Sequence, residues 1–327
     1  MPYQSFPGET GDSDSNAKLA AVRLPELAGK TFLDVGCNEG FFCFEALNRG
    51  ARQVVGIDRN EKFIDDARKR AEALKVPPGA ITFECRSWDG LPDQKFDVVL
   101  LLSALHYAAD QAALIHKLCG HLTPDGVLIL ECGVVYRPTT EFVEVVRSID
   151  KRSFPTMRMI NDILAPYAFK LIGSSPLQAG DPIPRRVFHI RLLKPIVLIV
   201  EGTGYQGKTT FARMCGEQGM PAIRMDDYVQ YRPKTEPIDP TLAAALTENF
   251  NPERIDLLYT RLSETKVGEL FICDLVAQLG KLNGRILVVE GAIWTHRKLL
   301  DRFIGELERA GYYPWRTQRA VVERKWF

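Results

Sequence analysis

The chain has 327 residues, of which 46% are hydrophobic and 25% are charged, and its formal net charge is +1. This length and hydrophobic content suffice for about two domains with separate cores. The near-zero net charge excludes a global field that would recruit nucleic acid or an anionic membrane. No apolar run approaches membrane-spanning length, and the polar amino-terminal segment is unlike a secretory signal. We therefore expect a soluble, cytoplasmic protein without a membrane span.

The seven cysteines are scattered along the chain, and no two of them are spaced as C-x-x-C. Several lie inside segments that we predict as strands or helices. This pattern favours reduced, mostly buried thiols in a cytosolic protein and disfavours a zinc site.

Residues 1–29 are predicted to form a flexible arm and a leading helix, because the first part of this segment is rich in Gly, Pro, Ser and Asp. From about residue 30, short apolar runs alternate with helical patterns around 40–49, 61–74 and 109–121. The runs predicted as strands are Thr31–Val35, Gln53–Ile57, Ile81–Cys85, Phe96–Leu102 and Gly126–Glu131. Two more runs, Phe169–Ser174 and Val187–Leu193, flank a proline-containing spacer and are predicted as an antiparallel pair. This alternation predicts an α/β domain over 30–194, with a mostly parallel sheet covered on both faces.

A second α/β domain is predicted over 195–327, after a boundary at Lys194-Pro195. Its first strand leads into a glycine-rich loop, and it differs from the first domain in the kind of loop. The predicted elements are a strand Ile196–Glu201, a helix over 208–217, a strand near Ala222–Met225, a proline-rich loop at 233–240, helices over 241–280, a strand Arg285–Glu290 and a helix from about 296.

The first glycine loop is Asp34-Val-Gly-Cys-Asn-Glu-Gly40, between an apolar strand and a helix. Glycines there let the backbone turn tightly and approach a ligand. Asp58 ends the second strand, where a carboxylate can accept hydrogen bonds from both hydroxyls of a ribose. In a G-x-G-x-x-G motif counted from Gly36, Asn38 and Phe41 occupy the second and third glycine positions. The loop therefore favours an adenosyl ligand without a pyrophosphate over NAD.

The segment Leu33–Phe42, together with Val55–Asp58, resembles the class I S-adenosylmethionine-dependent methyltransferases. Within them, it is most similar to the group of the tRNA carboxymethoxyuridine methyltransferases and many glycan-associated relatives. The resemblance covers about residues 30–193 and implies a seven-stranded Rossmann-like sheet whose last two strands are antiparallel.

The same resemblance implies the contacts of S-adenosylmethionine. Asp34, Gly36 and Gly40 would hold its amino-acid end, and Asp58 would hold its ribose. Its adenine would be bordered by Ser87, Trp88 and Asp89, although relatives often carry an acidic residue at the position of Ser87. The further expected contacts are Asn38, Arg59 and Ser103.

Ser103-Ala-Leu-His-Tyr107 follows the fourth strand, at the edge of the sheet where acceptors bind in open α/β folds. Methyl transfer from a sulfonium requires in-line positioning, and a base only when the acceptor starts protonated. His106 is a candidate base or anion contact, and Tyr107 a candidate lining residue. Alternatively, both side chains only pack the strand–helix turn.

The second loop, Gly202-Thr-Gly-Tyr-Gln-Gly-Lys-Thr209, fits G-x-x-x-x-G-K-[ST] at every fixed position. Such a loop points its backbone N–H groups at phosphate oxygens, while Lys208 reaches the β- and γ-phosphates and Thr209 coordinates magnesium. ATP and Mg²⁺ are therefore expected here. The expected ATP contacts are Gly202, Thr203, Gly204, Tyr205, Gln206, Gly207, Lys208, Thr209 and Thr210.

Two acidic segments accompany this loop. Met225-Asp-Asp-Tyr228 is predicted to end the following strand, and Glu290 ends a later one, where it could join the magnesium shell. Together with Gly207–Thr210, they resemble the uridine kinase and phosphoribulokinase group of P-loop kinases, as does Asn249-Phe-Asn-Pro252. The resemblance covers about 196–294 and implies Asp226 as the catalytic base, with Asp227 the close second. Lys208 of the glycine loop is the other candidate catalytic residue. The alternative is that these are ordinary solvated acids at strand ends.

These kinases continue with another strand and an arginine-rich lid, whereas this chain ends soon after Tyr312-Tyr-Pro-Trp-Arg-Thr-Gln-Arg319. Arg316, Arg319 and Arg324 either replace the lid or are surface charges on a terminal helix. Phosphoryl transfer requires positive charge near the transferred group.

Three functional hypotheses follow. The first is a bifunctional enzyme that phosphorylates a hydroxyl of a small-molecule or glycan acceptor and methylates the same molecule, as the chain-terminating enzymes of bacterial polysaccharides do with a different kinase fold. The second is an RNA- or tRNA-modifying methyltransferase-kinase, which the near-zero charge disfavours. The third is a methyltransferase with a degenerate ATP-binding module.

Overall fold

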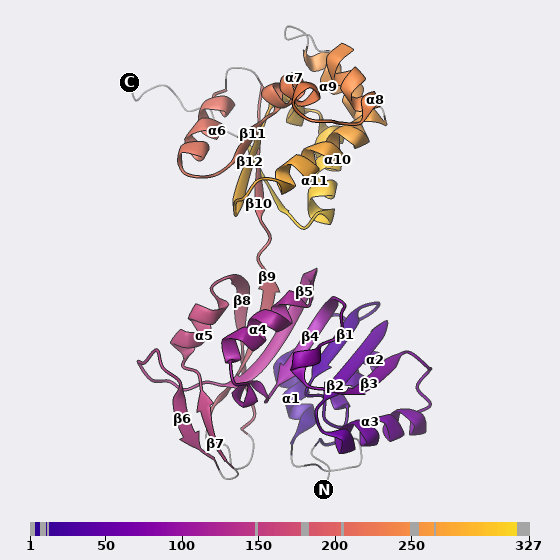
Figure 1. Cartoon of the computed structure of the whole chain (residues 1–327), viewed down its shortest axis with the longest axis vertical. Helices are drawn as coiled ribbons and strands as arrows, with labels where there is room; N and C mark the ends of the chain where they lie inside the picture. Colours follow the sequence, from indigo (N-terminus) through magenta and orange to yellow (C-terminus); the bar gives the residue numbers. More distant parts are fainter. Residues whose placement is uncertain are drawn as a thin grey trace. The chain divides into compact units, whose positions relative to one another are not determined.

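The computed structural model divides the chain into two compact units, Met1–Leu193 and Lys194–Phe327 (Figure 1). The structure describes residues 4–6, 11, 13–147, 150–177, 183–203, 206–248, 255–264 and 266–318. Each unit is built on a sheet with helices packed against it. None of the helices within these described ranges is long and apolar enough to cross a membrane.

The first unit contains a seven-stranded mixed sheet in the order β3-β2-β1-β4-β5-β9-β8. Neighbouring strands from β3 to β5 are parallel, whereas β9 is antiparallel to both β5 and β8. The predicted Rossmann-like sheet and its antiparallel last pair are thereby confirmed. Its strands are β1 (Thr31–Val35), β2 (Gln53–Asp58), β3 (Ile81–Cys85), β4 (Phe96–Leu102), β5 (Leu122–Gly133), β8 (Tyr167–Ser175) and β9 (Arg185–Leu192).

Helices cover both faces of this sheet because its strands are apolar on both sides. Side chains of β1 alternate between two cores, with Phe32 in the one and Leu33 in the other. The first core holds α1 (Ser15–Val22), α2 (Phe41–Asn48) and α3 (Glu61–Ala73); the second holds α4 (Gln111–Gly120) and α5 (Met157–Leu164). Asn60, Asp110 and Thr156 cap α3, α4 and α5 by accepting a backbone N–H in the first turn.

Three elements of the first unit were not predicted. One is α5; the others are the antiparallel strands β6 (Val143–Val146) and β7 (Lys151–Phe154). All three are short. A charged residue interrupts β6, and Phe154 is the one apolar residue of β7, so no continuous apolar run marks these strands. They nevertheless matter for the site, because β7 packs beside the turn that follows β4.

The second unit contains a four-stranded parallel sheet in the order β11-β12-β10-β13. The strands are β10 (Ile196–Glu201), β11 (Ala222–Arg224), β12 (Ile286–Glu290) and β13 (Tyr313–Gln318). The expectation of a terminal helix around Arg316 is wrong, since this residue lies on β13, directly beside β10. Pro314 obscures this strand in the sequence, but proline is tolerated at a sheet edge, where β13 lies.

Helix α6 (Lys208–Glu217) packs on one face of this sheet against Val200 and Val288. The other face is covered by α7 (Met225–Thr235), α8 (Pro240–Glu248), α9 (Ile255–Glu264), α10 (Val267–Gly280) and α11 (Arg297–Arg309). The prediction that Met225–Tyr228 ends a strand is wrong, because α7 begins at Met225. Asp226 and Asp227 lie in its first turn, where negative charge complements the helix dipole. The predicted proline-rich loop at 233–240 is shorter, as α7 continues through Pro233.

Candidate functional site

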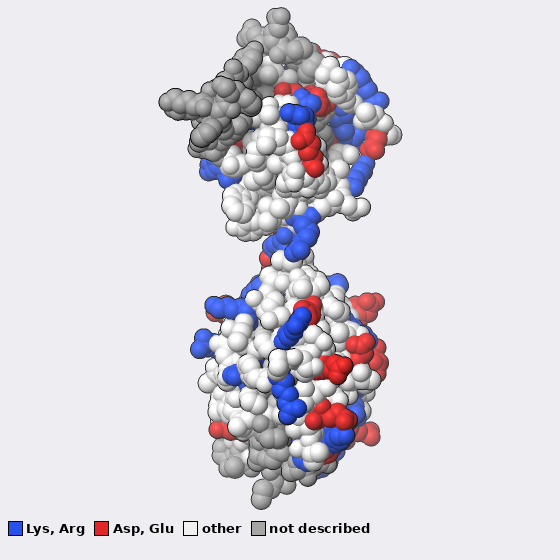
Figure 2. Space-filling model, turned by 90° about the vertical axis from the view of Figure 1, so that its left-hand side faces the viewer, with Lys and Arg blue, Asp and Glu red and all other residues white. Residues whose placement is uncertain are grey.

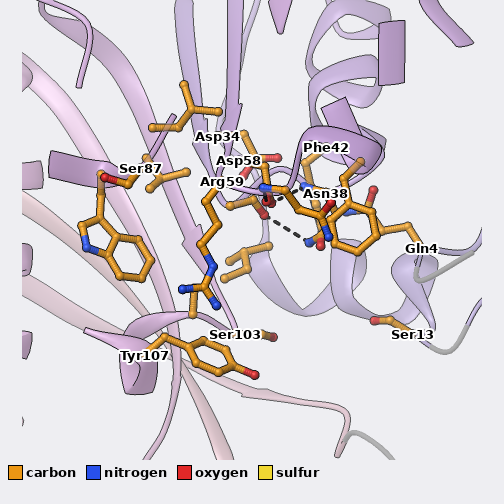
Figure 3. A pocket seen from close by; sticks show the side chains of 18 of the residues that line it. Gln4, Ser13, Asp34, Asn38, Phe42, Asp58, Arg59, Ser87, Ser103 and Tyr107 are labelled. Atoms are coloured by element: carbon orange, nitrogen blue, oxygen red, sulfur yellow. Dashed lines mark hydrogen bonds between the residues drawn. The ribbon is translucent and has the colours of Figure 1, made fainter. Parts of the chain in front are cut away.

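A pocket of about 490 Å³ opens at the carboxyl ends of β1, β2 and β4 in the first unit (Figure 3). It brings together nearly all of the contacts expected for the first site. The lining includes Asp34, Gly36, Asn38, Asp58, Arg59, Ser87, Trp88, Asp89, Ser103, His106 and Tyr107. Gly40 does not line it. This glycine begins α2 with φ of 86°, and an added Cβ would lie 2.7 Å from Cζ of Phe83, so packing already requires a residue without a side chain there.

The glycine loop is fastened to the end of β2 through Asp58. Gly36 and Asn38 both have positive φ, 80° and 48°, which turns the chain sharply after β1. The backbone N–H of Asn38 then donates to Oδ2 of Asp58 over 3.1 Å, and that of Asn60 donates to Oδ1 over 2.9 Å. Because each carboxylate oxygen can accept more than one hydrogen bond, Asp58 is held in place and can still bind a ligand.

Asp34 is the buried acid of the pocket, with only 2% of its surface exposed. Burial is the main cause that raises the pKa of Asp34 to about 7; the nearby charge of Asp58 acts in the same direction, and Cys43 and Lys18 oppose it with smaller effects. A cationic group of a ligand placed beside it would favour the ionised form.

A buried network of charged side chains forms part of the pocket wall and was not predicted. Glu131, at the end of β5, is fully buried, and Oε2 accepts hydrogen bonds from the backbone N–H and the hydroxyl of Ser103 at 2.7 and 2.8 Å. Nη1 of Arg185 lies 3.4 Å from the same oxygen, and Ser175 donates to Oε1. Lys18 of α1 donates from Nζ to Oγ of Ser103 over 2.9 Å. The signal in the sequence was faint: a lysine whose spacing from Ser15 and Val22 places it on the buried face of α1.

His106 and Tyr107 occupy the turn after β4. His106 is 6% exposed, and its ring stacks on Phe154 of β7 with 5.1 Å between the centroids. Its ring also lies 4.2 Å from that of Tyr107. Both residues line the pocket, so the packing role and the functional role that the sequence left open are compatible.

In the second unit, the loop between β10 and α6 holds the lysine in place. Gly207 caps α6 with φ of 72°, and Nζ of Lys208 donates to the carbonyl oxygen of Thr203 over 2.6 Å. The backbone N–H of Thr203 donates to Oε1 of Gln206 over 2.9 Å. Gly204 and Tyr205 lie outside the described residues, and Thr210 is exposed on the first turn of α6.

Acidic residues gather beside the start of α6. Glu290, 3% exposed at the end of β12, accepts a hydrogen bond from Oγ1 of Thr209 over 3.2 Å. Burial raises the pKa of Glu290, and the charge of Asp226 adds to this effect. Asp226 accepts a hydrogen bond from the hydroxyl of Tyr259 over 3.1 Å, and Asp227 forms a 3.0 Å ion pair with Arg224.

This arrangement fits a divalent cation shared with a phosphate ligand. A cation between Thr209 and Glu290 would offset the buried carboxylate. Within the described ranges, no three His, Cys, Asp or Glu residues cluster as a metal site of their own. Phosphate oxygens and water would therefore have to supply the remaining ligands, as they do for magnesium in nucleotide sites.

A cavity of about 460 Å³ lies next to this loop, lined in part by Thr203, Trp294 and Arg297. Arg316 of β13 also lines it and forms a two-pronged ion pair with Glu201, including a 2.9 Å bond from Nη2 to Oε2. The other two arginines considered as a lid, Arg319 and Arg324, lie outside the described residues.

Comparison with known proteins matches the first unit to methyltransferases. Residues 26–154 match a family model described as a methyltransferase domain. A tRNA U34 carboxymethyltransferase of Idiomarina loihiensis is 30% identical over 125 residues, 38% of this chain and 39% of that protein. A ubiquinone biosynthesis O-methyltransferase of Neisseria meningitidis serogroup C is 33% identical over 106 residues, 32% of this chain and 44% of that protein. The chain thus spans about two fifths of the length of these relatives.

Among solved structures, a S-adenosylmethionine-dependent methyltransferase from Mesorhizobium loti is 24% identical and has a TM-score of 0.42, covering 54% of this chain and 98% of its own. The sheet order places the first unit among the Rossmann-like open α/β folds, in which ligands bind at the carboxyl ends of the strands. The match to the family model makes this assignment more specific, because it shows that the first unit contains a class I S-adenosylmethionine-dependent methyltransferase domain.

Asp34 should make stability depend on pH. Its pKa of about 7 lies above the ordinary 3.8, so the folded state retains a proton that the unfolded state releases. Stability therefore falls as the pH rises from about 4 to about 7. We expect Asp34→Asn to abolish this loss and to stabilise the ligand-free protein at pH 8 by up to about 4 kcal/mol, with little effect near pH 4. Thermal unfolding at both pH values measures it.

Asp97→Asn is the matched control. Although burial acts to raise the pKa of Asp97, hydrogen bonds from Thr31 and Thr123 hold it below its ordinary value. This substitution should therefore destabilise the protein at pH 8. If Asp34→Asn also lowers the free energy of unfolding at pH 8, as Asp97→Asn is expected to do, burial does not dominate the ionisation of Asp34.

Proposed function

We propose that this chain is a bifunctional enzyme that phosphorylates a hydroxyl of an acceptor with ATP and methylates the same molecule with S-adenosylmethionine. The observation that carries the proposal is that one chain combines the pocket of the first unit with the glycine-rich loop of the second. A methyltransferase-domain pocket with Asp34 and Asp58 is joined to a unit in which a glycine-rich loop precedes Lys208 and the Thr209–Glu290 pair.

In the first unit, Asp58 would bind both ribose hydroxyls of the cofactor, and Asp34 would accept from its ammonium group. Ser87 and Trp88 line the part of the pocket assigned to the adenine. When bound, the cofactor supplies an electrophilic methyl group. Tyr107 and His106 border the space left for the acceptor, where they would orient it in line with that methyl group and exclude water.

In the second unit, backbone N–H groups of the loop and Lys208 would hold the triphosphate, while Thr209 and Glu290 would hold its magnesium. Asp226 would accept the proton of the acceptor hydroxyl, and Tyr259 positions this carboxylate. The hydroxyl oxygen bonds to the γ-phosphorus as the bond to the bridging oxygen breaks, and ADP leaves. The four-stranded parallel sheet with β10 between β12 and β13 supports this proposal.

The acceptor is proposed to be a small molecule or a glycan, with a methyl phosphate as the product. Phosphorylation creates an anionic oxygen that needs no strong base before methylation. On the face shown in Figure 2, described basic and acidic side chains are interspersed among uncharged surface and form no continuous basic patch. Together with the net charge of +1, this disfavours a long nucleic-acid substrate.

RNA modification is the second candidate, because a matched relative is a tRNA U34 carboxymethyltransferase. Both candidates are tested by incubating the full chain with γ-³²P-labelled ATP and methyl-³H-labelled S-adenosylmethionine, with either a glycan extract or total RNA. We expect both labels in one glycan-derived product. Both labels in RNA would favour the second candidate. A product with the methyl label but without phosphorus would indicate a methyltransferase whose ATP-binding module is degenerate.

Asp58→Ala should weaken binding of S-adenosylmethionine by at least about 100-fold, because two charge-assisted hydrogen bonds to the ribose are lost, each contributing about 1.5–3 kcal/mol. Calorimetric titration measures this affinity. Asp66→Ala is the control, since Asp66 is an exposed carboxylate on α3 that pairs loosely with Lys69 at 3.9 Å. Equal affinities in the two variants would contradict the assignment of Asp58.

A further inference from the structure

Three guanidinium groups surround the ring of Tyr107 in the first unit. The Cζ atoms of Arg59, Arg147 and Arg152 lie 6.0, 5.6 and 4.8 Å from its centroid. They come from separate elements: Arg59 follows β2, Arg147 follows β6, and Arg152 lies on β7. Their convergence is thus a product of the fold rather than of a local run of basic residues.

One carboxylate, Asp150, links two of these arginines. Nη2 of Arg147 lies 2.6 Å from Oδ1 of Asp150, and Nε of Arg152 lies 2.7 Å from Oδ2. Nη2 of Arg147 also donates to the hydroxyl of Tyr107 over 3.2 Å. The side chain of Arg147 is only 5% exposed, so its orientation is determined by these partners. Arg59, Arg147, Arg152, Asp150 and Tyr107 thus form one corner of the first unit. Its three guanidinium groups and one carboxylate sum to a net positive charge, which favours an anionic ligand.

The corner opens into the pocket on the side away from the glycine loop. Arg59, Tyr107 and Arg147 all line the pocket. Figure 3 shows the side chain of Arg59 extending from beside Asp58 toward Tyr107, whereas Asn38 lies on the other side of Asp58. One end of the pocket therefore carries the acids assigned to the cofactor, and the other end carries guanidinium groups.

We propose that Arg147, Tyr107 and Arg59 form a subsite for the phosphate of a phosphomonoester acceptor, with Arg152 as a positioning residue that acts through Asp150. This inference rests on the proposed methyltransferase function and specifies the substrate of that unit. Guanidinium groups bind phosphate oxygens in pairs with defined geometry, and the phenol can donate a further hydrogen bond.

Such a subsite would present one phosphate oxygen to the methyl group. That oxygen forms a bond to the methyl carbon as the carbon–sulfur bond breaks, and the electron pair stays on sulfur. The monoester dianion becomes a monoanionic methyl diester, so no proton has to be removed. Arg147 and Arg59 would hold the other oxygens throughout.

The test measures binding of inorganic phosphate and of glucose 6-phosphate to the full chain by calorimetry, in the presence of S-adenosylhomocysteine, magnesium and ADP. ADP is included to fill the proposed nucleotide site of the second unit, so that the phosphate probes do not bind there. Glucose is the uncharged control ligand. Arg147→Gln should weaken the affinity for both phosphate probes at least about tenfold, and Tyr107→Phe by less, because charged hydrogen bonds contribute more than neutral ones. Arg68→Gln, an exposed arginine of α3, is the matched control and should change nothing.

Affinity for S-adenosylhomocysteine separates the possible failures. It should stay within about twofold in Arg147→Gln and Arg152→Gln, which also establishes that these variants fold. If the unsubstituted chain binds no S-adenosylhomocysteine, the proposed methyltransferase function fails. If it binds this compound but Arg147→Gln leaves phosphate affinity unchanged, the subsite is refuted. Binding of a 5′-phosphorylated oligonucleotide, with no binding of either phosphate probe, would also overturn it.

Discussion

Glu131→Ala is expected to destabilise the first unit by about 3–5 kcal/mol, because it removes the carboxylate that the buried Arg185 and Lys18 share. Burial acts to lower the pKa of Lys18, so this side chain can lose its proton once Glu131 is gone. Arg185 cannot, since a guanidinium stays charged at any ordinary pH. The hydroxyls of Ser103 and Ser175 lose an acceptor as well.

A chain with two units need not unfold in one step, so the measurement should resolve them. Hydrogen exchange followed by mass spectrometry on peptides of β4 and β5 reports the first unit within the full chain. In calorimetry, the midpoint temperature for unfolding of the first unit should fall by about 10 °C. Glu45→Ala is the control, because Glu45 forms an exposed pair with Arg49 and should contribute less than about 1 kcal/mol. A loss as small as that of the control would mean that the buried network does not stabilise this unit.

The parts of the molecule that were predictable from the sequence are those that local chemistry determines. β1 and β10 were predicted with their observed bounds because each is a short, mainly apolar run that leads directly into a glycine loop. The pocket at the end of β1 and β2 was predictable for the same reason. The carboxyl ends of parallel strands meet at one edge, so Asp34 and Asp58 had to lie close together.

The parts that escaped prediction depend on contacts between distant segments. Lys18, Glu131 and Arg185 come from α1, β5 and β9, and nothing within each segment indicates that they meet. The contact of Arg147 with Tyr107 was equally hidden in the sequence, because it depends on the pairing of β6 with β7. At Met225, strand and helix patterns overlap, and the acids that favour a helix start were interpreted as a strand end.

On the proposed kinase function, Lys208→Ala should reduce phosphorylation of the acceptor by at least about 100-fold, since it removes a positive charge that would lie beside the transferred phosphate. Lys208 is buried, and its ammonium group already lies at the loop through its bond to Thr203, so little rearrangement is needed to reach a phosphate. Transfer of ³²P from ATP measures the effect. Lys281→Ala, an exposed lysine of the second unit that pairs with Glu236, is the control and should retain full activity.

The same variant decides the order of the two reactions. If the methyl group goes to a phosphate, Lys208→Ala must also lose methylation of the unphosphorylated acceptor, while a chemically phosphorylated acceptor should still be methylated at the normal rate. The phosphate subsite at Tyr107 requires this order, because the unphosphorylated acceptor has no anion to bind there. Methylation of the unphosphorylated acceptor that persists in Lys208→Ala would therefore refute the sequence of phosphorylation first, even if both units prove active.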